Sequence, residues 1–188
     1  MAGLLDLNLP TNMSKALFLD RDGIINVDHG YVHTPQEFHF NRDIFKLLHL
    51  FIQNHYILFI VTNQSGIGRG YYTHKDFDHL TQWMLERFKE EDIHIEKVLY
   101  CPHTPQEGCS CRKPKTGMID QILAQYPIDL KKSLMIGDKQ SDIDLARNAK
   151  IQRSIAISSD DSIQGADHYF KSITACKAYL EANPKSLD

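Results

Sequence analysis

The chain has 188 residues, of which 42% are hydrophobic and 24% charged, and its formal net charge is −3 at pH 7. This composition is typical of one folded domain with a substantial apolar core, and it excludes a largely disordered chain. The net negative charge provides no basic field for nucleic acid, and no apolar run approaches the roughly 20 residues that span a bilayer. We therefore expect no nucleic-acid partner and no membrane segment.

The beginning of the chain lacks the basic start and long apolar centre of a secretory signal. We therefore expect a cytoplasmic location. Because Met13, Ser14 and Lys15 stand directly before the first apolar run, we predict an N-terminal extension over residues 1–14. Residues 15–188 are predicted to form a single domain, and we expect this domain to be a monomer.

Five short apolar runs alternate along the chain with longer amphipathic stretches. Short, partly β-branched runs bounded by turn residues predict strands, and the stretches between them predict crossover helices. This alternation is typical of a doubly wound α/β domain with a Rossmann-like parallel sheet. The predicted strands are 16–19, 57–61, 97–100, 133–136 and 154–157. The predicted helices are 43–53, 73–91, 118–125, 141–148 and 174–182.

An acidic turn, Asp20-Arg21-Asp22-Gly23, follows the first predicted strand. Two carboxylates one residue apart at the end of a buried strand are costly unless a cation, a proton or a substrate needs them. One carboxylate can attack phosphorus and form an aspartyl-phosphate, while the other protonates the leaving oxygen and later deprotonates water. Asp-Gly is also an ordinary turn pair, so the turn by itself leaves a catalytic and a structural interpretation equally open.

A second polar cluster follows the second predicted strand. Ligands of open α/β sheets bind beyond the carboxyl ends of the strands, so this cluster and the acidic turn are expected to meet there. Thr62 and Asn63 supply a hydroxyl and an amide, and the glycines of Ser65-Gly66-Ile67-Gly68 allow close approach to an anion. Phosphate binding and an ordinary loop are both open. Arg69 either reaches a distal polar group of a substrate or lies on the solvated surface.

The fourth predicted strand ends in Gly137-Asp138-Lys139. Asp138 can join Asp20 and a backbone carbonyl around Mg²⁺, a hard cation that prefers oxygen ligands. Such an ion would reduce the repulsion between acidic groups and an incoming phosphate. For Asp142, stabilisation of the first helical turn and support of a metal or a lysine are equally open.

Three of the four cysteines stand close together, and with His103 they give the pattern C-x-H-x5-C-x-C in a Pro/Gly-rich segment. Three cysteines and one histidine match a tetrahedral Zn²⁺ site, which would be structural because it leaves no open position for water. A disulfide or a redox C-x-C pair are the alternatives, and neither uses the histidine. The predicted ligands are Cys101, His103, Cys109 and Cys111. Cys176 is predicted to be a buried thiol.

The predicted zinc loop ends in Arg112 and Lys113. A metal in this loop would hold the two cations rigidly toward the strand ends. Lys113 is therefore the candidate for neutralising the nucleophile and the transferring phosphoryl oxygens, although a basic pair before proline is also common in surface turns. His29 lies just after the acidic turn and is a candidate for contacting a sugar or phosphate.

With these motifs in their order, the chain resembles the haloacid dehalogenase-like phosphohydrolases over residues 15–157. The resemblance implies a phosphatase without a cap domain, in which the zinc loop partly replaces the cap. It makes Asp20 the nucleophile and Asp22 the general acid/base, with Thr62 and Lys113 stabilising the phosphoryl group. The implied Mg²⁺ ligands are Asp20, the backbone carbonyl of Asp22, and Asp138.

Within this superfamily the chain is most similar to the heptose bisphosphate phosphatases, through residues 26–32, 62–70, 101–103 and 109–114. That resemblance implies a small sugar bisphosphate as substrate, with removal of the 7-phosphate and retention of the 1-phosphate for lipopolysaccharide-core or related glycan precursors. The implied substrate contacts, taken with the candidates above, are Asp28, His29, Gly30, Tyr31, Thr62, Asn63, Gln64, Ser65, Arg69, Arg112, Lys113 and Lys139.

The segment 103–109 is shorter than in many heptose enzymes and resembles the zinc loop of histidinol-phosphate phosphatases, which keeps that substrate open as an alternative. Polynucleotide 3′-phosphatases carry a similar acidic turn, and a zinc-stabilised binding module for nucleic-acid ends is a further alternative. The net charge of −3 and the lack of a basic stripe argue against both hypotheses that involve nucleic acid.

Overall fold

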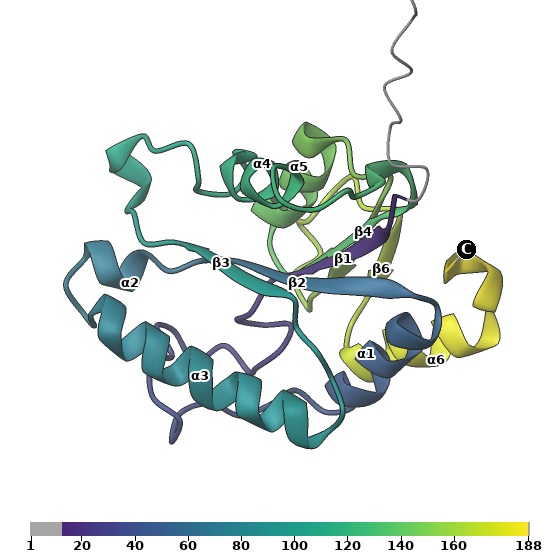
Figure 1. The fold of residues 1–188 in the computed structure, drawn as a ribbon, viewed down its shortest axis with the longest axis horizontal. Coiled ribbons are helices and arrows are strands. Elements are labelled where there is room, and N and C mark those ends of the chain that lie inside the picture. Colours follow the sequence, from purple (N-terminus) through teal and green to yellow (C-terminus); the bar gives the residue numbers. More distant parts are fainter. Residues whose placement is uncertain (1–12, 188) are drawn as a thin grey trace, which may run out of the picture.

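The computed structural model describes residues 13–187, which form a six-stranded sheet with helices on both of its faces (Figure 1). The strands are β1 (Lys15–Leu19), β2 (Tyr56–Asn63), β3 (Lys97–Cys101), β4 (Leu134–Gly137), β5 (Arg153–Ile157) and β6 (His168–Phe170). The helices are α1 (Ile44–Gln53), α2 (Ser65–Gly68), α3 (His74–Glu90), α4 (Gly117–Leu123), α5 (Gln140–Ala149) and α6 (Ile173–Ala182). Short 3₁₀ turns cover Pro105–Glu107, Leu130–Lys132 and Pro184–Leu187.

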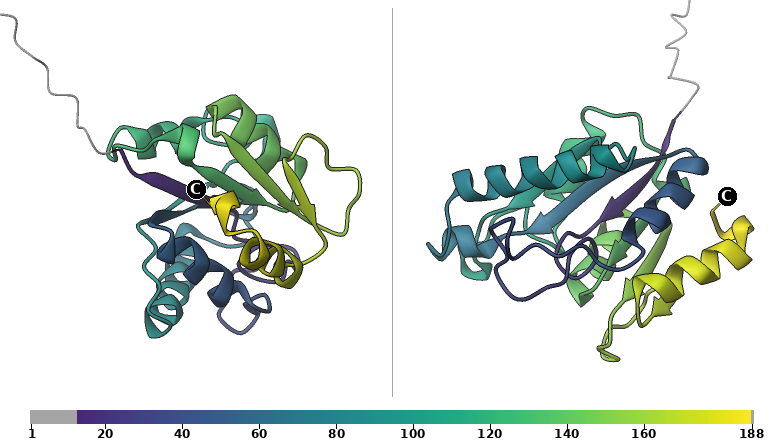
Figure 2. Two further views of the ribbon diagram at one scale, coloured as in Figure 1. Left: turned by 90° about the vertical axis from the view of Figure 1, so that its right-hand side faces the viewer. Right: turned by 90° about the horizontal axis from the view of Figure 1, so that it is seen from below.

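The strand order is β3-β2-β1-β4-β5-β6, and every neighbouring pair is parallel. This topology confirms the predicted doubly wound α/β fold. Helices α4 and α5 lie on one face of the sheet, whereas α1, α3 and α6 lie on the other (Figure 1). Helices α1 and α6 pack against each other, as the two further views also show (Figure 2). None of the helices within residues 13–187 has the length and apolar character that crossing a membrane requires.

Strand β1 lies in the middle of the sheet because both of its faces are apolar. Leu17 and Leu19 belong to the core under α1, α3 and α6, whereas Ala16 and Phe18 belong to a second core under α4 and α5. All four side chains are fully buried. A strand covered by helices on both faces reads as a continuous apolar run rather than an alternating one, which is the pattern we used to predict it.

The ten predicted elements are all present, with ends within two residues of those predicted. Two short elements were missed. β6 has three residues at the edge of the sheet, and α2 has four residues in a segment that we interpreted as a loop because it contains two glycines. Neither is long enough to produce a periodic apolar pattern, which explains why sequence reasoning passed over them.

Residues 1–12, most of the predicted N-terminal extension, lie outside the described part of the chain. Ser14 was assigned to that extension, yet it pairs with Ile128. Its N–H donates to the carbonyl of Pro127 at 2.9 Å, and its own carbonyl accepts from the N–H of Asp129 at 2.8 Å. Ser14 is therefore hydrogen-bonded to the domain that we predicted to begin at residue 15.

Candidate active site

A cavity of about 290 Å³ opens at the carboxyl ends of β1 and β2. The predicted site residues that line it are Asp20, Asp22, Asp28, Gly30, Tyr31, Thr62, Asn63, Gln64, Ser65, Arg112, Lys113 and Lys139. Tyr72 and Ser141 also line it and were not predicted. His29 and Arg69 are exposed and are not among the lining residues, so the structure does not bring these two predicted contacts to the cavity.

The acidic turn is held against the end of β4 by a glycine. Gly23 has φ 90°, a left-handed conformation that favours glycine, and a Cβ added there would lie 2.2 Å from Oδ2 of Asp138. The N–H of Asp20 donates to the carbonyl of Ile136 at 3.0 Å, which extends the pairing of β1 with β4 by one residue. Asp20 and Asp138, which are 118 residues apart, therefore meet at the sheet edge.

Lys113 is the cation at the centre of the site. Its Nζ lies 2.9 Å from Oδ1 of Asp20 and 2.6 Å from Oδ1 of Asp142, and it donates to the carbonyl of Val61 at 2.9 Å. Burial opposes the charge of this side chain, but the carboxylates of Asp142 and Asp20 raise its pKa. A protonated lysine is thus held between two carboxylates, in the position expected for neutralising charge at Asp20.

Asp142 has both of the roles that the sequence left open, the start of a helix and the support of a lysine. Its Oδ2 accepts the backbone N–H of Lys139 at 3.0 Å and so caps the first turn of α5, while its Oδ1 pairs with Lys113. The side chain is completely buried against Gly137, where an added Cβ would lie 2.1 Å from the Cβ of Asp142. Glycine at the end of β4 makes room for this carboxylate.

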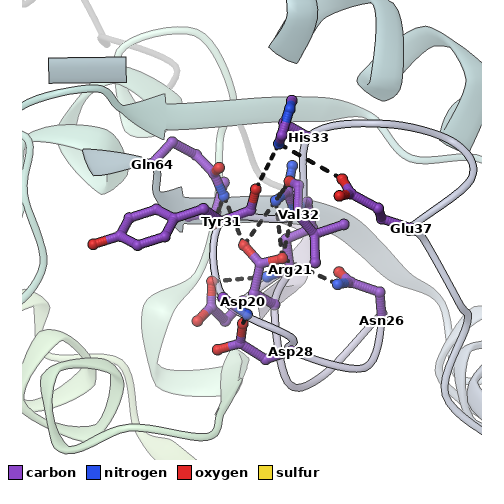
Figure 3. A network of polar contacts seen from close by, with 12 residues as sticks. Asp20, Arg21, Asn26, Asp28, Tyr31, Val32, His33, Glu37 and Gln64 are labelled. Atoms are coloured by element: carbon purple, nitrogen blue, oxygen red, sulfur yellow. Dashed lines mark hydrogen bonds and ion pairs between the residues drawn. The ribbon is translucent and has the colours of Figure 1, made fainter. Parts of the chain in front are cut away.

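Asp22 is surrounded by donors from Arg21, Asn26 and Gln64, three residues that Figure 3 labels. Arg21 is 1% exposed, and its Nη2 donates to Oδ2 of Asp22 at 2.8 Å and to the carbonyl of Val32 at 2.7 Å. Nδ2 of Asn26 donates to Oδ1 of Asp22 at 3.0 Å, and Nε2 of Gln64 donates to Oδ2 at 2.8 Å. We assigned no role to Arg21, because a motif does not reveal that a charged side chain turns inward.

Asn63 joins the end of β2 to the segment that carries Lys113. Its Oδ1 accepts the backbone N–H of Lys113 at 3.0 Å, and its Nδ2 donates to the backbone carbonyl of Lys113 at 3.3 Å. Asn63 was predicted to contact substrate, and it does line the cavity. In this structure the oxygen and the nitrogen of its amide are both hydrogen-bonded to the main chain of Lys113. Asn63 therefore positions Lys113.

Three carboxylates, those of Asp20, Asp138 and Asp142, place one oxygen each within 4.8 Å of the others. Oδ1 of Asp138 is buried and has no hydrogen-bond partner among the described residues. Burial and the neighbouring charge of Asp20 raise the pKa of Asp138 to about 8. A buried oxygen without a donor beside a second carboxylate fits a hard cation such as Mg²⁺, which would compensate this charge.

The four predicted zinc ligands lie together at the end of β3 and in the loop that follows. The Sγ atoms of Cys101 and Cys109 are 3.5 Å apart, and Nδ1 of His103 lies 3.6 Å from Sγ of Cys101 and 3.3 Å from Sγ of Cys111. Zinc bonds of about 2.3 Å to sulfur and about 2.0 Å to nitrogen place tetrahedral ligands about 3.5–3.8 Å apart. The spacing fits zinc and is too long for the disulfide bond of about 2.05 Å. Cys176 is fully buried, as predicted.

The cysteine loop is hydrogen-bonded to the segment after β2. The N–H of Gln64 donates to the carbonyl of Cys101 at 2.7 Å, and the N–H of Gly68 donates to the carbonyl of Pro102 at 2.9 Å. A Cβ on Gly68 would lie 2.8 Å from that carbonyl oxygen, so this close approach needs glycine. The segment after β2, which lines the cavity through Gln64 and Ser65, is therefore attached to the cysteine loop.

Comparisons with known proteins agree with this geometry. A family model described as HAD-hydrolase-like matches residues 110–167. A crystal structure from Mesorhizobium loti is described as that of a putative had-like phosphatase. It superposes with a TM-score of 0.80 at 28% identity, and the alignment covers 93% of this chain and 88% of that one. The fold and the site define the chain as a haloacid dehalogenase-like hydrolase.

Two curated relatives narrow the assignment. The chain is 48% identical over 147 residues to D-glycero-beta-D-manno-heptose-1,7-bisphosphate 7-phosphatase of Helicobacter pylori, covering 78% of this chain and 85% of that protein. It is 47% identical to D-glycero-alpha-D-manno-heptose-1,7-bisphosphate 7-phosphatase of Campylobacter jejuni, covering 78% of this chain and 84% of that protein. The chain belongs to the D-glycero-D-manno-heptose-1,7-bisphosphate 7-phosphatase family.

A structure of D,D-heptose 1,7-bisphosphate phosphatase from B. bronchiseptica, complexed with magnesium and phosphate, has the same fold. Its TM-score is 0.78 at 24% identity, and the alignment covers 89% of this chain and 98% of that one.

Proposed function

We propose that this chain is a Mg²⁺-dependent phosphatase that removes the 7-phosphate from D-glycero-D-manno-heptose 1,7-bisphosphate and retains the 1-phosphate. The observation that carries the proposal is the buried contact of Lys113 with Asp20, at the end of the central strand and in the wall of the cavity. The names of relatives that are 47–48% identical support the choice of substrate.

In the first step, a carboxylate oxygen of Asp20 attacks the phosphorus of the 7-phosphate. The new Asp20–phosphorus bond forms as the bond from phosphorus to O7 of the sugar breaks, and Asp22 gives its proton to O7. In the second step, Asp22 takes a proton from water, and the water oxygen displaces Asp20 from phosphorus. Phosphate leaves, and both carboxyl groups return to their starting states.

Lys113 and Thr62 are the groups that we propose to stabilise the phosphoryl oxygens during transfer. Lys113 keeps its charge through Asp142, which remains paired with it when Asp20 becomes esterified. The Thr62 side chain is 1% exposed at the end of β2 and lines the same cavity. Fixed donors in a buried site need no rearrangement when charge develops, which is the main source of such stabilisation.

We propose that Asp20, Asp138 and the backbone carbonyl of Asp22 hold Mg²⁺. The unpartnered oxygen of Asp138 and the spacing of the carboxylates support this assignment. When bound, the ion would neutralise negative charge between the acidic groups and the phosphate. We further propose that Cys101, His103, Cys109 and Cys111 hold a structural Zn²⁺, because their four ligand atoms have tetrahedral spacing.

The charges at the rim favour a bisphosphate over histidinol phosphate. Arg112 and Lys139 both line the cavity. Burial opposes the charge of Lys139, but the carboxylates of Asp138, Asp20 and Asp28 raise its pKa, so the side chain is protonated at neutral pH. Lys139 is paired with Asp28 at 3.1 Å, whereas Arg112 has no carboxylate partner among the described residues. Arg112 therefore suits the second phosphate of a sugar bisphosphate and would repel the ammonium group of histidinol phosphate.

A phosphate-release panel with Mg²⁺ tests the proposal. The substrates are the α and β anomers of D-glycero-D-manno-heptose 1,7-bisphosphate, histidinol phosphate and a 3′-phosphorylated oligonucleotide. We expect one of the heptose anomers to give the highest kcat/KM, with the 1-phosphate retained in the product. A higher kcat/KM for histidinol phosphate or for the oligonucleotide would overturn the proposed substrate.

A further inference from the structure

A buried tyrosine, Tyr72, contacts the amide that joins two of the proposed catalytic groups. Its hydroxyl donates to Oε1 of Gln64 at 2.6 Å. Nε2 of the same Gln64 donates to Oδ2 of Asp22 at 2.8 Å and lies 2.9 Å from Oγ1 of Thr62. One amide therefore connects a phenol on one side with a carboxylate and a hydroxyl on the other.

The chemistry of these groups fixes the direction of the hydrogen bonds. Oδ2 of Asp22 accepts from Arg21 and from the NH₂ group of Gln64, so the NH₂ group faces Asp22 and the amide oxygen faces the Tyr72 hydroxyl. Burial raises the pKa of Tyr72 to about 12, so its hydroxyl keeps the proton that the amide oxygen accepts. Because Thr62 Oγ1 accepts the second N–H of Gln64, the hydroxyl proton of Thr62 is free to donate to a phosphoryl oxygen.

The Tyr72 ring has little room to move. The His33 ring stacks on it with centroids 5.1 Å apart and an interplanar angle of 4°. A Cβ added at Gly66 would lie 2.1 Å from a carbon of the Tyr72 ring, so the ring packs directly on the backbone of α2. The hydroxyl is thereby aimed at Gln64 by contacts that do not involve the hydroxyl itself.

We propose that Tyr72 is a positioning residue for phosphoryl transfer, and that it acts by fixing the Gln64 amide between Asp22 and Thr62. The inference rests on the proposed function, because it requires Asp22 and Thr62 to act on a phosphoryl group. Without the phenol hydroxyl, the buried Oε1 of Gln64 has lost its donor, and the amide is free to turn away from the carboxylate. Tyr72 then affects the rate of chemistry more than the binding of substrate.

The variant Tyr72→Phe keeps the ring and removes only the hydroxyl. We expect kcat to fall about tenfold, with KM within about twofold of wild type, on heptose 1,7-bisphosphate and on p-nitrophenyl phosphate. The matched control is Tyr71→Phe, which removes the hydroxyl of an exposed neighbour for which the described structure gives no hydrogen bond, and which should leave kcat unchanged. Unchanged kcat in Tyr72→Phe would overturn the inference.

A double-mutant cycle with Gln64→Met tests whether the Tyr72 hydroxyl acts through the Gln64 amide or through a general structural effect. If Tyr72 acts through Gln64, the substitution Tyr72→Phe should change kcat by less than about twofold in the Gln64→Met background. A tenfold loss in both backgrounds would show that Tyr72 acts by another route and would overturn the inference. Thermal unfolding of each variant is measured alongside, so that a rate change is compared only between folded proteins.

A second readout needs no turnover. The side-chain NH₂ signals of Gln64, assigned by their disappearance in Gln64→Met, should exchange slowly with water in wild type and in Tyr71→Phe, and faster in Tyr72→Phe. Equal exchange in the two tyrosine variants would overturn the positioning role. Wild-type protein that hydrolyses neither substrate would instead overturn the proposed function, while the exchange measurement would still test the contact of Tyr72 with Gln64.

Discussion

The acid–lysine centre and the cysteine loop are stabilised in different ways. In the centre, Lys113 and Asp142 are at most 3% exposed and lie at the carboxyl edge of a sheet whose central strands β1 and β4 are buried on both faces. In the loop, Cys109 and Cys111 are only half-buried, and the surrounding segment has a single 3₁₀ turn. The acid–lysine centre is stabilised by the apolar core beneath it. The stability of the cysteine loop depends instead on what links its four candidate zinc ligands to one another.

Lys113 belongs to both regions, because its backbone continues the loop while its Nζ reaches the centre. Asn63 connects the two by binding the main chain of Lys113 on both sides. The proposed catalytic cation is positioned by two carboxylates at its Nζ, the tip of the side chain, and by the Asn63 amide at its backbone, the base of the side chain. The proposed zinc site would add a second constraint at the base. Changes to the tip and to the base should therefore have different consequences.

The largest effect is expected at the nucleophile. Asp20→Asn keeps the shape of the side chain but removes the attacking carboxylate, so phosphate release should fall at least about 1000-fold. Steady-state phosphate release measures the loss, and circular dichroism shows whether the fold is kept. Activity within tenfold of wild type would remove Asp20 from the mechanism.

At the tip of the lysine, Asp142→Ala leaves a buried cation with one carboxylate partner. Breaking a buried pair costs about 3–5 kcal/mol of unfolding free energy, which urea denaturation can measure. The matched control is Asp144→Ala in the same helix, where the exposed pair with Arg147 contributes less than about 1 kcal/mol. Equal losses in the two variants would mean that the Lys113 pair is no stronger than a surface pair.

At the base, Cys109→Ser should reduce the zinc content measured by mass spectrometry and lower kcat about tenfold, because the loop would no longer hold Lys113 in place. Cys176→Ala changes a buried cysteine in the other core and should keep its zinc. Zinc-free wild-type protein together with unchanged kinetics in Cys109→Ser would refute the cross-link.

The smallest effect is expected when the backbone of Lys113 loses only its hydrogen bonds to Asn63. Asn63→Ala should lower kcat several-fold, since each lost bond to the main chain of Lys113 is worth about 1 kcal/mol. Asn148→Ala is a close control, because Nδ2 of Asn148 donates to the neighbouring carbonyl of Pro114 from an exposed position. If both variants keep wild-type kcat, the Asn63 amide does not position the lysine.

The sequence predicted the sheet and the residues around its edge well, for identifiable reasons. The run Ala16–Leu19 is apolar without interruption because β1 is covered on both faces, and such runs are readable without a structure. The acidic turn and Asp138 follow directly after β1 and β4, and Thr62 lies at the end of β2, so a parallel sheet brings them to one edge. The cysteine pattern predicted the loop cluster because metal ligands are restricted to few residue types.

The pairings between side chains could not be predicted in this way. Asn63 and Lys113 are 50 residues apart, and neither position indicates that an amide would hold the main chain of the other. Arg21 lies within a motif, yet its inward direction depends on the carbonyl of Val32, which is fixed by an irregular connection. His29 was predicted from the resemblance and from its place after the acidic turn, and Arg69 from its place in the loop after β2. Neither lines the cavity, because a place in the chain does not specify which side of a loop faces it, and their contacts with substrate remain predictions.

Trapping the covalent intermediate tests the central claim most directly. Wild-type protein turning over heptose 1,7-bisphosphate with Mg²⁺ is treated with borohydride, which reduces an aspartyl-phosphate to homoserine, and the peptides are identified by mass spectrometry. The account predicts homoserine at position 20 and at no other aspartate. Reduction at a different aspartate, or turnover by Asp20→Asn at the wild-type rate, would contradict it.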